Sequence, residues 1–299
     1  MRRVLCALVA VLLVTAGCTA EGESRSSIVV TTNILGDITR NIAGDQAPVT
    51  VLMKANADPH SFGISAQQAA ETERAGLIVY NGLGLEEGML STVRAAQESG
   101  VPVLPVGERV NPISHPGGEV PDPHFWTDPG RVRDAVNVIA EQIIAEVDGV
   151  DAAAVRANAD RYRGEIEALD TTMTERFATI PPERRKLVTN HHVFGYLAQR
   201  FGFEVIGAVI PGGTTLASPS AADLKSLADA VRAAGVPAIF ADSSQPDRLA
   251  RVLAEQAGLH VAVTPLFSES LSEPGQGAAT YLEMMRANTE AIATSLTRP

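Results

Sequence analysis

The chain has 299 residues, with 24 Lys and Arg against 35 Asp and Glu, which gives a formal charge of -11. Phosphate backbones are bound by neutralising their charge, so this balance excludes nucleic acid as a partner. With 45% hydrophobic and 20% charged residues the chain can bury a core, and its length predicts two lobes rather than one.

The first 17 residues have the layout of a secretory signal peptide. An arginine pair precedes the apolar run Val4 to Val14, which is too short to span a bilayer. The tetrad Thr15 to Cys18 resembles a bacterial lipobox, although a larger aliphatic residue is usual where Thr15 stands. We therefore expect cleavage before Cys18 and lipidation of its thiol, with soluble export as the alternative. Since Cys6 is the other of the two cysteines, no thiol remains in the body for a disulfide or a metal site.

Residues 18–27 are expected to form a lipidated cysteine followed by a flexible tether, because they are small and polar. The mature charge becomes -13, since residues 1–17 carry two arginines and no acidic residue. We expect an exported protein, in the periplasm or at the outer face of the cytoplasmic membrane, held by its lipid. No later segment has the length and apolarity of a membrane span, so a transport role would need a separate permease.

The body alternates short β-branched runs with amphipathic stretches of helical period. Continuous apolar runs of strand length are typical of buried parallel strands, so the alternation predicts an α/β fold. The expected strands are Ile28–Thr32, Val49–Met53, Leu77–Tyr80, Val101–Val106, Leu187–Thr189, Glu204–Ile210, Ala238–Ala241 and His260–Val263. The expected helices between them are Leu35–Ala43, Ser65–Ala75, Glu87–Glu98, Gly130–Val147, Ala221–Ala234 and Pro246–Ala257.

The longest helical pattern, Ala152 to Thr179, lies between the two sets of four strands. A helix of about 28 residues is about 42 Å long, enough to cross the whole molecule. We therefore expect two lobes, each with a mainly parallel four-stranded sheet flanked by helices, joined by one long rigid helix. The expected boundaries are 28–150 for the N-terminal lobe, 151–181 for the linking helix and 182–299 for the C-terminal lobe.

Three of the six histidines lie where metal or ligand sites are expected. His60 and His191 follow the carboxyl ends of predicted parallel strands, where open α/β sheets place their ligands. His124 lies in the proline-rich loop Pro121 to Pro129, whose prolines would hold its imidazole in place. Each histidine alone is more often a surface or core residue than a ligand, but their shared placement favours a metal site.

The other candidate residues have simpler interpretations. His260 lies within a predicted strand and is expected to be structural. His115 is expected in a solvated loop, with a weak metal contact as the alternative. Asp242 is read as an Asx-turn or a helix N-cap, and Glu269 on its own as a solvated surface acid.

These residues, with the motifs around them, resemble the zinc/manganese solute-binding proteins of bacterial ABC importers. The likeness covers nearly the whole mature chain and depends on several motifs in order. They are Thr32-Asn33-Ile34 to Asp37-Ile38, Asp58-Pro59-His60, Asn81 to Glu86, Asp122 to Pro129, His191 with Phe194-Gly195-Tyr196, and Tyr281 to Asn288. The resemblance implies two lobes joined by a long rigid helix, with the metal in the cleft between them.

The resemblance also implies a set of site residues and partners. The implied ligands are His60 and His124 from the N-terminal lobe, and His191 and Glu269 from the C-terminal lobe. Glu269 stands where the family usually has aspartate. Outer positions around the ligands are implied for Asn33 and for Asp242, where the family often has glutamate. His192 neighbours His191 and must point elsewhere, so we expect it to lie either around the ligands or at the surface. The implied partners are a cognate ABC permease and its ATPase, and we expect the binding protein to be a monomer.

The ligand types favour Zn²⁺ as the transported ion over Mn²⁺. Three imidazoles and one carboxylate suit a tetrahedral d¹⁰ cation, whereas manganese prefers more oxygen ligands. Manganese-preferring members of the family tend to have a carboxylate where His191 stands. Because the imidazoles must be neutral to bind, we expect zinc affinity to fall as the pH drops through about 6.5.

Other functions stay open at this point. The chain could be a manganese-specific member of the same family, or a metallochaperone or adhesin on the same scaffold. A zinc hydrolase is a further alternative, because three histidines with a free fourth position can activate water. Glu269 separates binding from hydrolysis: it either completes the metal shell or stands off as a general base.

Overall fold

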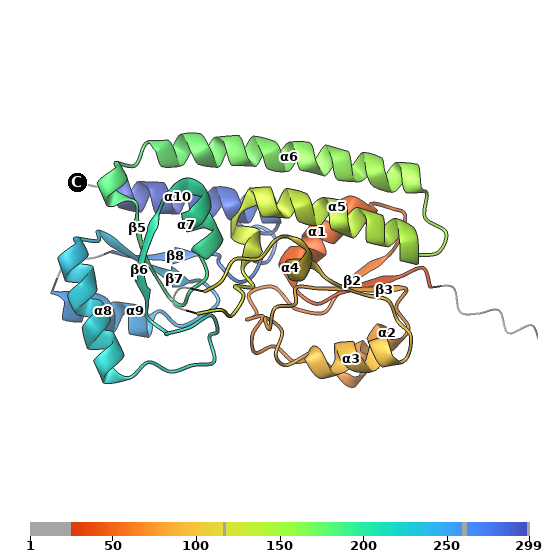
Figure 1. Ribbon diagram of the computed structural model, residues 1–299, viewed down its shortest axis with the longest axis horizontal. Coiled ribbons are helices and arrows are strands. Elements are labelled where there is room, and N and C mark those ends of the chain that lie inside the picture. The colour runs from red at the N-terminus through yellow and green to blue at the C-terminus, as the bar shows by residue number, and fades with distance from the viewer. Residues whose placement is uncertain (1–24, 116–117, 259–261, 298–299) are drawn as a thin grey trace, which may run out of the picture.

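The computed structural model describes residues 25–115, 118–258 and 262–297 (Figure 1). Two four-stranded parallel sheets form its two lobes. The first has the order β2-β1-β3-β4 and the second β6-β5-β7-β8. Their strands are β1 Ile28–Val30, β2 Val49–Val51, β3 Leu77–Tyr80, β4 Val103–Pro105, β5 Lys186–Thr189, β6 Glu204–Ala208, β7 Ala238–Asp242 and β8 Ala262–Leu266.

Helices flank both sheets, which confirms the predicted fold class (Figure 1). The α-helices are α1 Asn33–Ala43, α2 Ala66–Glu73, α3 Leu90–Glu98, α4 Val106–Arg109, α5 Pro129–Glu146, α6 Ala152–Ala178, α7 Gly195–Phe201, α8 Ala221–Ala234, α9 Arg248–Ala257 and α10 Tyr281–Thr297. Two short 3₁₀ helices are η1 Phe125–Thr127 and η2 Pro182–Arg184. Helices α4, α7 and α10 were not among the expected helices. The predicted strand containing His260 begins in residues outside the described ones, and its described part starts at Ala262.

Helix ends follow the local sequence signals. Asp128 accepts a hydrogen bond from the backbone N–H of Gly130 and caps α5, with Pro129 in its first turn. Ser220 and Asp223 form a reciprocal capping box at the start of α8. Gly235 ends the same helix in the left-handed region, at φ 62°, which only glycine adopts without strain.

Helix α6 extends along one side of both lobes and packs on α1, α5 and α10 (Figure 1). Its buried face carries seven apolar side chains at helical spacing, namely Val155, Ala159, Tyr162, Ile166, Leu169, Met173 and Phe177. Beneath it one continuous hydrophobic core runs from Ile28 in the first sheet to Leu296 in α10. The two lobes therefore share a packed core on the α6 side.

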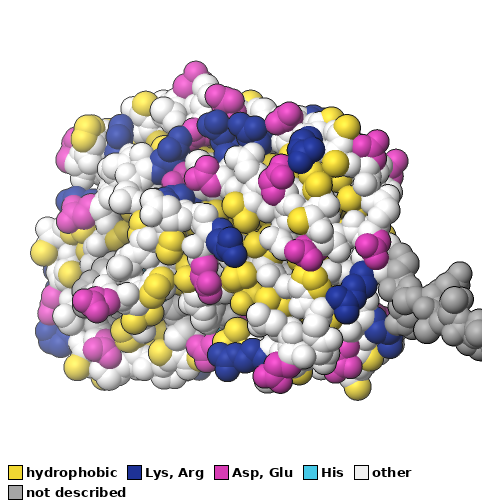
Figure 2. All heavy atoms as spheres, turned by 45° about the vertical axis from the view of Figure 1, so that its right-hand side comes forward, with side chains coloured by type: hydrophobic (Ala, Val, Ile, Leu, Met, Phe, Trp, Pro, Cys, Tyr) yellow, Lys and Arg dark blue, Asp and Glu magenta, His cyan; other side chains and the backbone are white. Residues whose placement is uncertain are grey.

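One face of the molecule carries charged side chains of both signs (Figure 2). Figure 2 shows one face, on which acidic and basic side chains are interspersed and none of the described histidines is visible. Among the described residues, no helix combines the length and apolarity needed to cross a membrane.

Candidate metal centre

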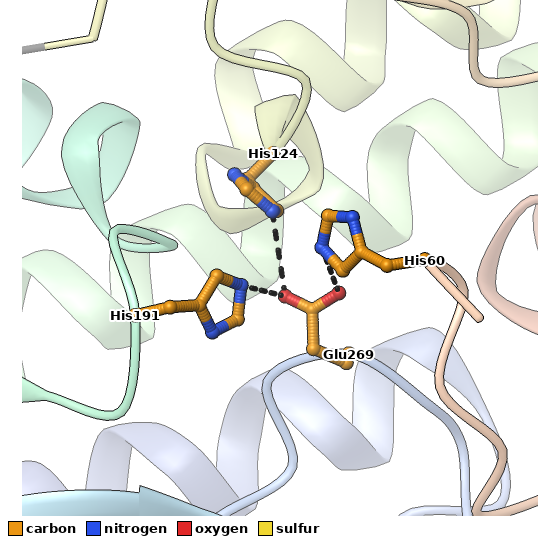
Figure 3. A group of neighbouring side chains, drawn as sticks. All are labelled: His60, His124, His191 and Glu269. Carbon is orange, nitrogen blue, oxygen red and sulfur yellow. Dashed lines mark ion pairs between the residues drawn. The ribbon is translucent and has the colours of Figure 1, made fainter. Parts of the chain in front are cut away.

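Four side chains meet between the two lobes: His60, His124, His191 and Glu269 (Figure 3). None of them is more than 1% exposed. The Glu269 carboxylate lies 3.6 Å from Nε2 of His60, 3.5 Å from Nε2 of His124 and 3.1 Å from Nε2 of His191. One potential ligand atom from each residue lies within 4.8 Å of all the others. The structure thus brings together the four residues that the resemblance implied as ligands.

Each of the four comes from a different connecting segment. His60 follows β2, and His191 follows β5 after a single residue. Glu269 lies between β8 and α10, and His124 directly precedes η1. Three of these segments leave the carboxyl ends of parallel strands, the edge at which open α/β sheets bind ligands. The hydroxyl of Thr189 donates to the carbonyl of His191 at 2.7 Å and fixes the turn that carries this histidine.

Two of the histidines belong to the same local motif, an Asp-Pro-His turn. The backbone N–H of His60 donates to Oδ1 of Asp58 at 2.9 Å, and that of His124 donates to Oδ1 of Asp122 at 2.9 Å. Such Asx-turns hold the backbone two residues beyond the aspartate, while the proline between them fixes φ. The carboxylate of each turn therefore sets the position from which its imidazole projects.

Asp122 also contacts the ring that it positions. Its Oδ1 lies 2.7 Å from Nδ1 of His124, so the ring donates there and presents Nε2 to Glu269. A carboxylate on the far nitrogen orients a metal-binding imidazole and raises its basicity. Asp122 was not singled out from the sequence, although the repeated Asp-Pro-His pattern is the signal that could have identified it.

Residues of the N-terminal lobe hold the segment that carries Glu269. Asn33 accepts from the N–H of Leu271 at 2.9 Å and donates to the hydroxyl of Ser270 at 2.7 Å. The indole N–H of Trp126 donates to the carbonyl of Ser268 at 2.9 Å. Glu269 is therefore held from both sides by residues that do not belong to the four.

Asp242 contacts the same segment from the C-terminal lobe. It accepts a hydrogen bond from the hydroxyl of Ser268 and, as the Asx-turn interpretation predicts, another from the N–H of Ser244 at 2.7 Å. Asp242 and Asn33 thus both contact the segment that carries Glu269. The half-buried side chain of His192 does not join them, and its backbone N–H donates to the carbonyl of Gly212 at 3.1 Å.

His115 is more enclosed than expected for a solvated loop, since its side chain is only 14% exposed. Its Nδ1 lies 3.9 Å from Oδ2 of Asp122. With His124 these residues form a second group with metal-ligand spacing. Because Oδ1 of Asp122 already binds His124, only two ligand atoms remain there, too few to enclose a cation.

Burial sets the protonation of the four residues. It raises the pKa of Glu269 well above its usual value, and the positive field of His60 only partly opposes this. Burial lowers the pKa of His60, His124 and His191. Burial therefore favours the neutral form of all three imidazoles, so we expect their protonation to oppose metal binding below pH 6.5 rather than at it. The pKa of Asp122 is raised to about 6, again by burial.

The unpartnered atoms of the group fit a divalent cation. Both carboxylate oxygens of Glu269 and the Nε2 atoms of the three histidines are buried without a hydrogen bond. Buried polar atoms without a partner are rare because they cost free energy. Metal–nitrogen bonds of about 2.0 to 2.1 Å place tetrahedral ligand atoms about 3.3 Å apart, which agrees with the distances to Glu269.

Comparisons with known proteins show which proteins the chain is similar to. The family described as zinc-uptake complex component A, periplasmic, matches residues 28–295. Over 291 residues the chain is 31% identical to the zinc-binding protein TroA of Treponema pallidum, covering 93% of this chain and 91% of that protein. It is 26% identical to the manganese-binding lipoprotein MntA of Halalkalibacterium halodurans, with 97% of each covered.

A third relative and a solved structure complete the comparison. The chain is 29% identical to the metal ABC transporter substrate-binding lipoprotein ScbA of Streptococcus cristatus, covering 94% of this chain and 92% of that protein. The structure of the periplasmic zinc-binding protein TroA superposes with a TM-score of 0.84 at 29% identity, over 92% of this chain and 100% of that one. This chain therefore belongs to the family of the periplasmic component A of zinc-uptake complexes.

Proposed function

We propose that this chain is the extracytoplasmic binding protein of a metal ABC importer, and that it captures Zn²⁺ for a permease. The observation that carries the proposal is the convergence of unpartnered, buried ligand atoms from His60, His124, His191 and Glu269 on one point between the lobes. Family membership supports it, as does the similarity to ScbA, which is named as a substrate-binding lipoprotein of a metal ABC transporter.

The donor set supports zinc over manganese. Three neutral imidazoles and one carboxylate offer the nitrogen-rich tetrahedral shell that Zn²⁺ accepts, whereas Mn²⁺ is better served by oxygen. Relatives are named for zinc as well as for manganese, so the proposal depends on the ligands of this chain. His191 is the critical residue, because a carboxylate in its place would give two oxygen donors.

The position of Glu269 supports binding rather than hydrolysis. A zinc hydrolase keeps one coordination position for the attacking water. Here the carboxylate lies within 3.1 to 3.6 Å of all three Nε2 atoms and takes the fourth position. A site closed by four protein ligands stores and releases a cation, and it leaves no place for a nucleophile.

The cellular setting is part of the same proposal. Residues 1–24 lie outside the described ones, so the signal peptide (1–17), the lipidated Cys18 and the tether remain predictions from the sequence. The relatives named as lipoproteins support lipidation. We propose a monomer anchored outside the cytoplasmic membrane, with lobes at 28–150 and 182–299 joined by residues 151–181, that delivers zinc to a permease with its own ATPase.

Zinc uptake by cells tests the proposed function. A strain of the source bacterium from which the gene for this protein has been deleted would be complemented with the wild type, His191→Ala or Cys18→Ala. Zinc accumulation by the cells would then be measured in zinc-poor medium. We expect the wild type to restore accumulation and His191→Ala to fail at equal export. Cys18→Ala should be released from the membrane fraction. Full restoration by His191→Ala would contradict the proposal.

A further inference from the structure

The two Asp-Pro-His turns hold their histidines differently. In the second turn, Asp122 binds both the backbone N–H and the ring of His124. In the first turn, Asp58 binds only the backbone N–H of His60, and neither ring nitrogen of His60 has a hydrogen bond. The orientation of His124 is thus fixed within its own turn, whereas the position of His60 depends on how the turn itself is held.

The free oxygen of Asp58 is bound from the opposite lobe. Its Oδ2 accepts from the hydroxyl of Thr215 at 2.6 Å and from the side-chain amide of Gln245 at 3.1 Å. Thr215 lies in the segment after β6 and Gln245 in the segment after β7. The hydroxyl of Ser61 adds a third bond from within the turn, at 3.1 Å. Hydrogen bonds to a carboxylate are among the stronger ones, so this contact ties the two lobes together beside the site.

We propose that Asp58 is a positioning residue that couples closure of the lobes to the placement of His60. Asp58, Thr215 and Gln245 are named here the Asp58 clasp. One carboxylate oxygen holds the backbone of the zinc ligand, and the other holds the facing lobe. The inference rests on the proposed function, since it concerns release of the same cation.

The clasp has a consequence for how zinc leaves. The lobes share a packed core under α6, and none of the three clasp residues belongs to it, so we expect the lobes to separate at the clasp rather than through that core. Opening there breaks the bonds from Thr215 and Gln245 and frees the turn that carries His60. Residues that contact ligands from outside typically change metal affinity by about 10-fold to 100-fold. We expect the clasp to act within that range, mainly on dissociation.

The test leaves Asp58 intact, because removing it would also destroy the turn. The double variant Thr215→Val with Gln245→Leu removes both donors from the facing lobe. Thr214→Val is the matched control, since this hydroxyl lies in the same segment but accepts from the backbone N–H of Leu216. Thr215→Ser keeps the donor and serves as the conservative rescue.

Stopped-flow release of zinc to an excess of a chromophoric chelator gives the first readout. We expect the double variant to release zinc about 10-fold to 100-fold faster than the wild type. Thr214→Val and Thr215→Ser should release it at the wild-type rate. The inference is overturned if the double variant matches the wild type, or if either single variant is as fast as the double one.

A distance measurement gives a second readout that does not need zinc. Spin labels at Gln67→Cys and Ser218→Cys, both exposed and on opposite lobes, report the separation of the lobes in a Cys18→Ser chain. We expect a broader distance distribution in the double variant than in the wild type, with and without zinc. If the wild type binds no zinc, the proposed function is wrong. The distance distributions still show whether Thr215 and Gln245 hold the two lobes together. Identical distributions would reject it.

Discussion

Asp122 binds Nδ1 of His124 at 2.7 Å, while Nε2 of the same ring lies 3.5 Å from the Glu269 carboxylate. The imidazole is thereby held between two carboxylates, Asp122 at Nδ1 and Glu269 at Nε2. The contact with Asp122 fixes the tautomer of the ring. We therefore expect Asp122 to affect metal binding although it is not one of the four candidate ligands.

Replacing Asp122 by Asn tests this relationship. The amide oxygen can still accept from the backbone N–H of His124, but a neutral amide no longer polarises the ring. We expect zinc affinity in a competition titration to fall about 10-fold to 100-fold. Asp122→Ala should lose more, because the turn is lost as well. Wild-type affinity in Asp122→Asn would show that the contact does not orient the ligand.

His124 and His115 form a matched pair for substitution, since their ring centroids are 6.2 Å apart. His124→Ala removes a ligand and should weaken zinc binding by more than about 100-fold, beyond what outer partners contribute. His115→Ala should leave the affinity unchanged, because its ring lies outside the four-residue group. Isothermal titration calorimetry in competition with a chelator of known affinity measures the zinc affinity of both variants. Equal losses would mean that the site has been assigned to the wrong residues.

Asn33 is expected to act on zinc through the Glu269 segment. Asn33→Ala leaves the N–H of Leu271 without its acceptor, which costs about 1 to 3 kcal/mol of unfolding free energy in a buried setting. We also expect zinc affinity to fall about 10-fold, as the carboxylate loses its fixed position. Denaturant unfolding and zinc titration measure the two effects. Asn41→Ala is the control, because the side-chain amide of Asn41 donates within α1, to the carbonyl of Asp37.

Glu269→Gln should stabilise the metal-free protein at neutral pH. Burial raises the pKa of Glu269 in the folded state, so its contribution to stability is present below the unfolded value of 4.5 and is lost as the pH rises. Each unit of raised pKa corresponds to about 1.4 kcal/mol. Denaturant unfolding with a chelator present should therefore show a gain for Glu269→Gln at pH 7 that shrinks towards pH 4.5. A gain that is independent of pH would contradict the buried-carboxylate explanation.

The sequence predicted most of the fold because its signals are local. All eight strands lie within or beside the predicted runs, and the linking helix begins at the predicted Ala152. The helices at α7 and α10 were missed for a physical reason. Gly195 opens α7 and gives no start signal. In α10 the buried positions Asn288 and Thr289 are polar and interrupt the apolar periodicity that Tyr281, Met284 and Ile292 would otherwise give.

The candidate site could be predicted from the sequence only in part. Proline and strand-end placement identified the three histidines, but Glu269 followed only from the family resemblance, since its loop has no distinguishing pattern. The contacts that hold it join residues far apart in the chain, such as Asn33 and Leu271. Pairings over such distances are set by the packed lobes. Asp122, in contrast, belongs to the Asp-Pro-His pattern that occurs twice in the sequence, and this repeat could have identified it.

Competing zinc and manganese titrations of the wild type and Glu269→Ala, with metal analysis of the purified protein, test the central claim most directly. We expect one zinc per chain, tighter binding of zinc than of manganese, and a loss of zinc affinity above about 100-fold in Glu269→Ala. Tighter binding of manganese, or wild-type zinc affinity in Glu269→Ala, would contradict a zinc site made of three histidines and this glutamate.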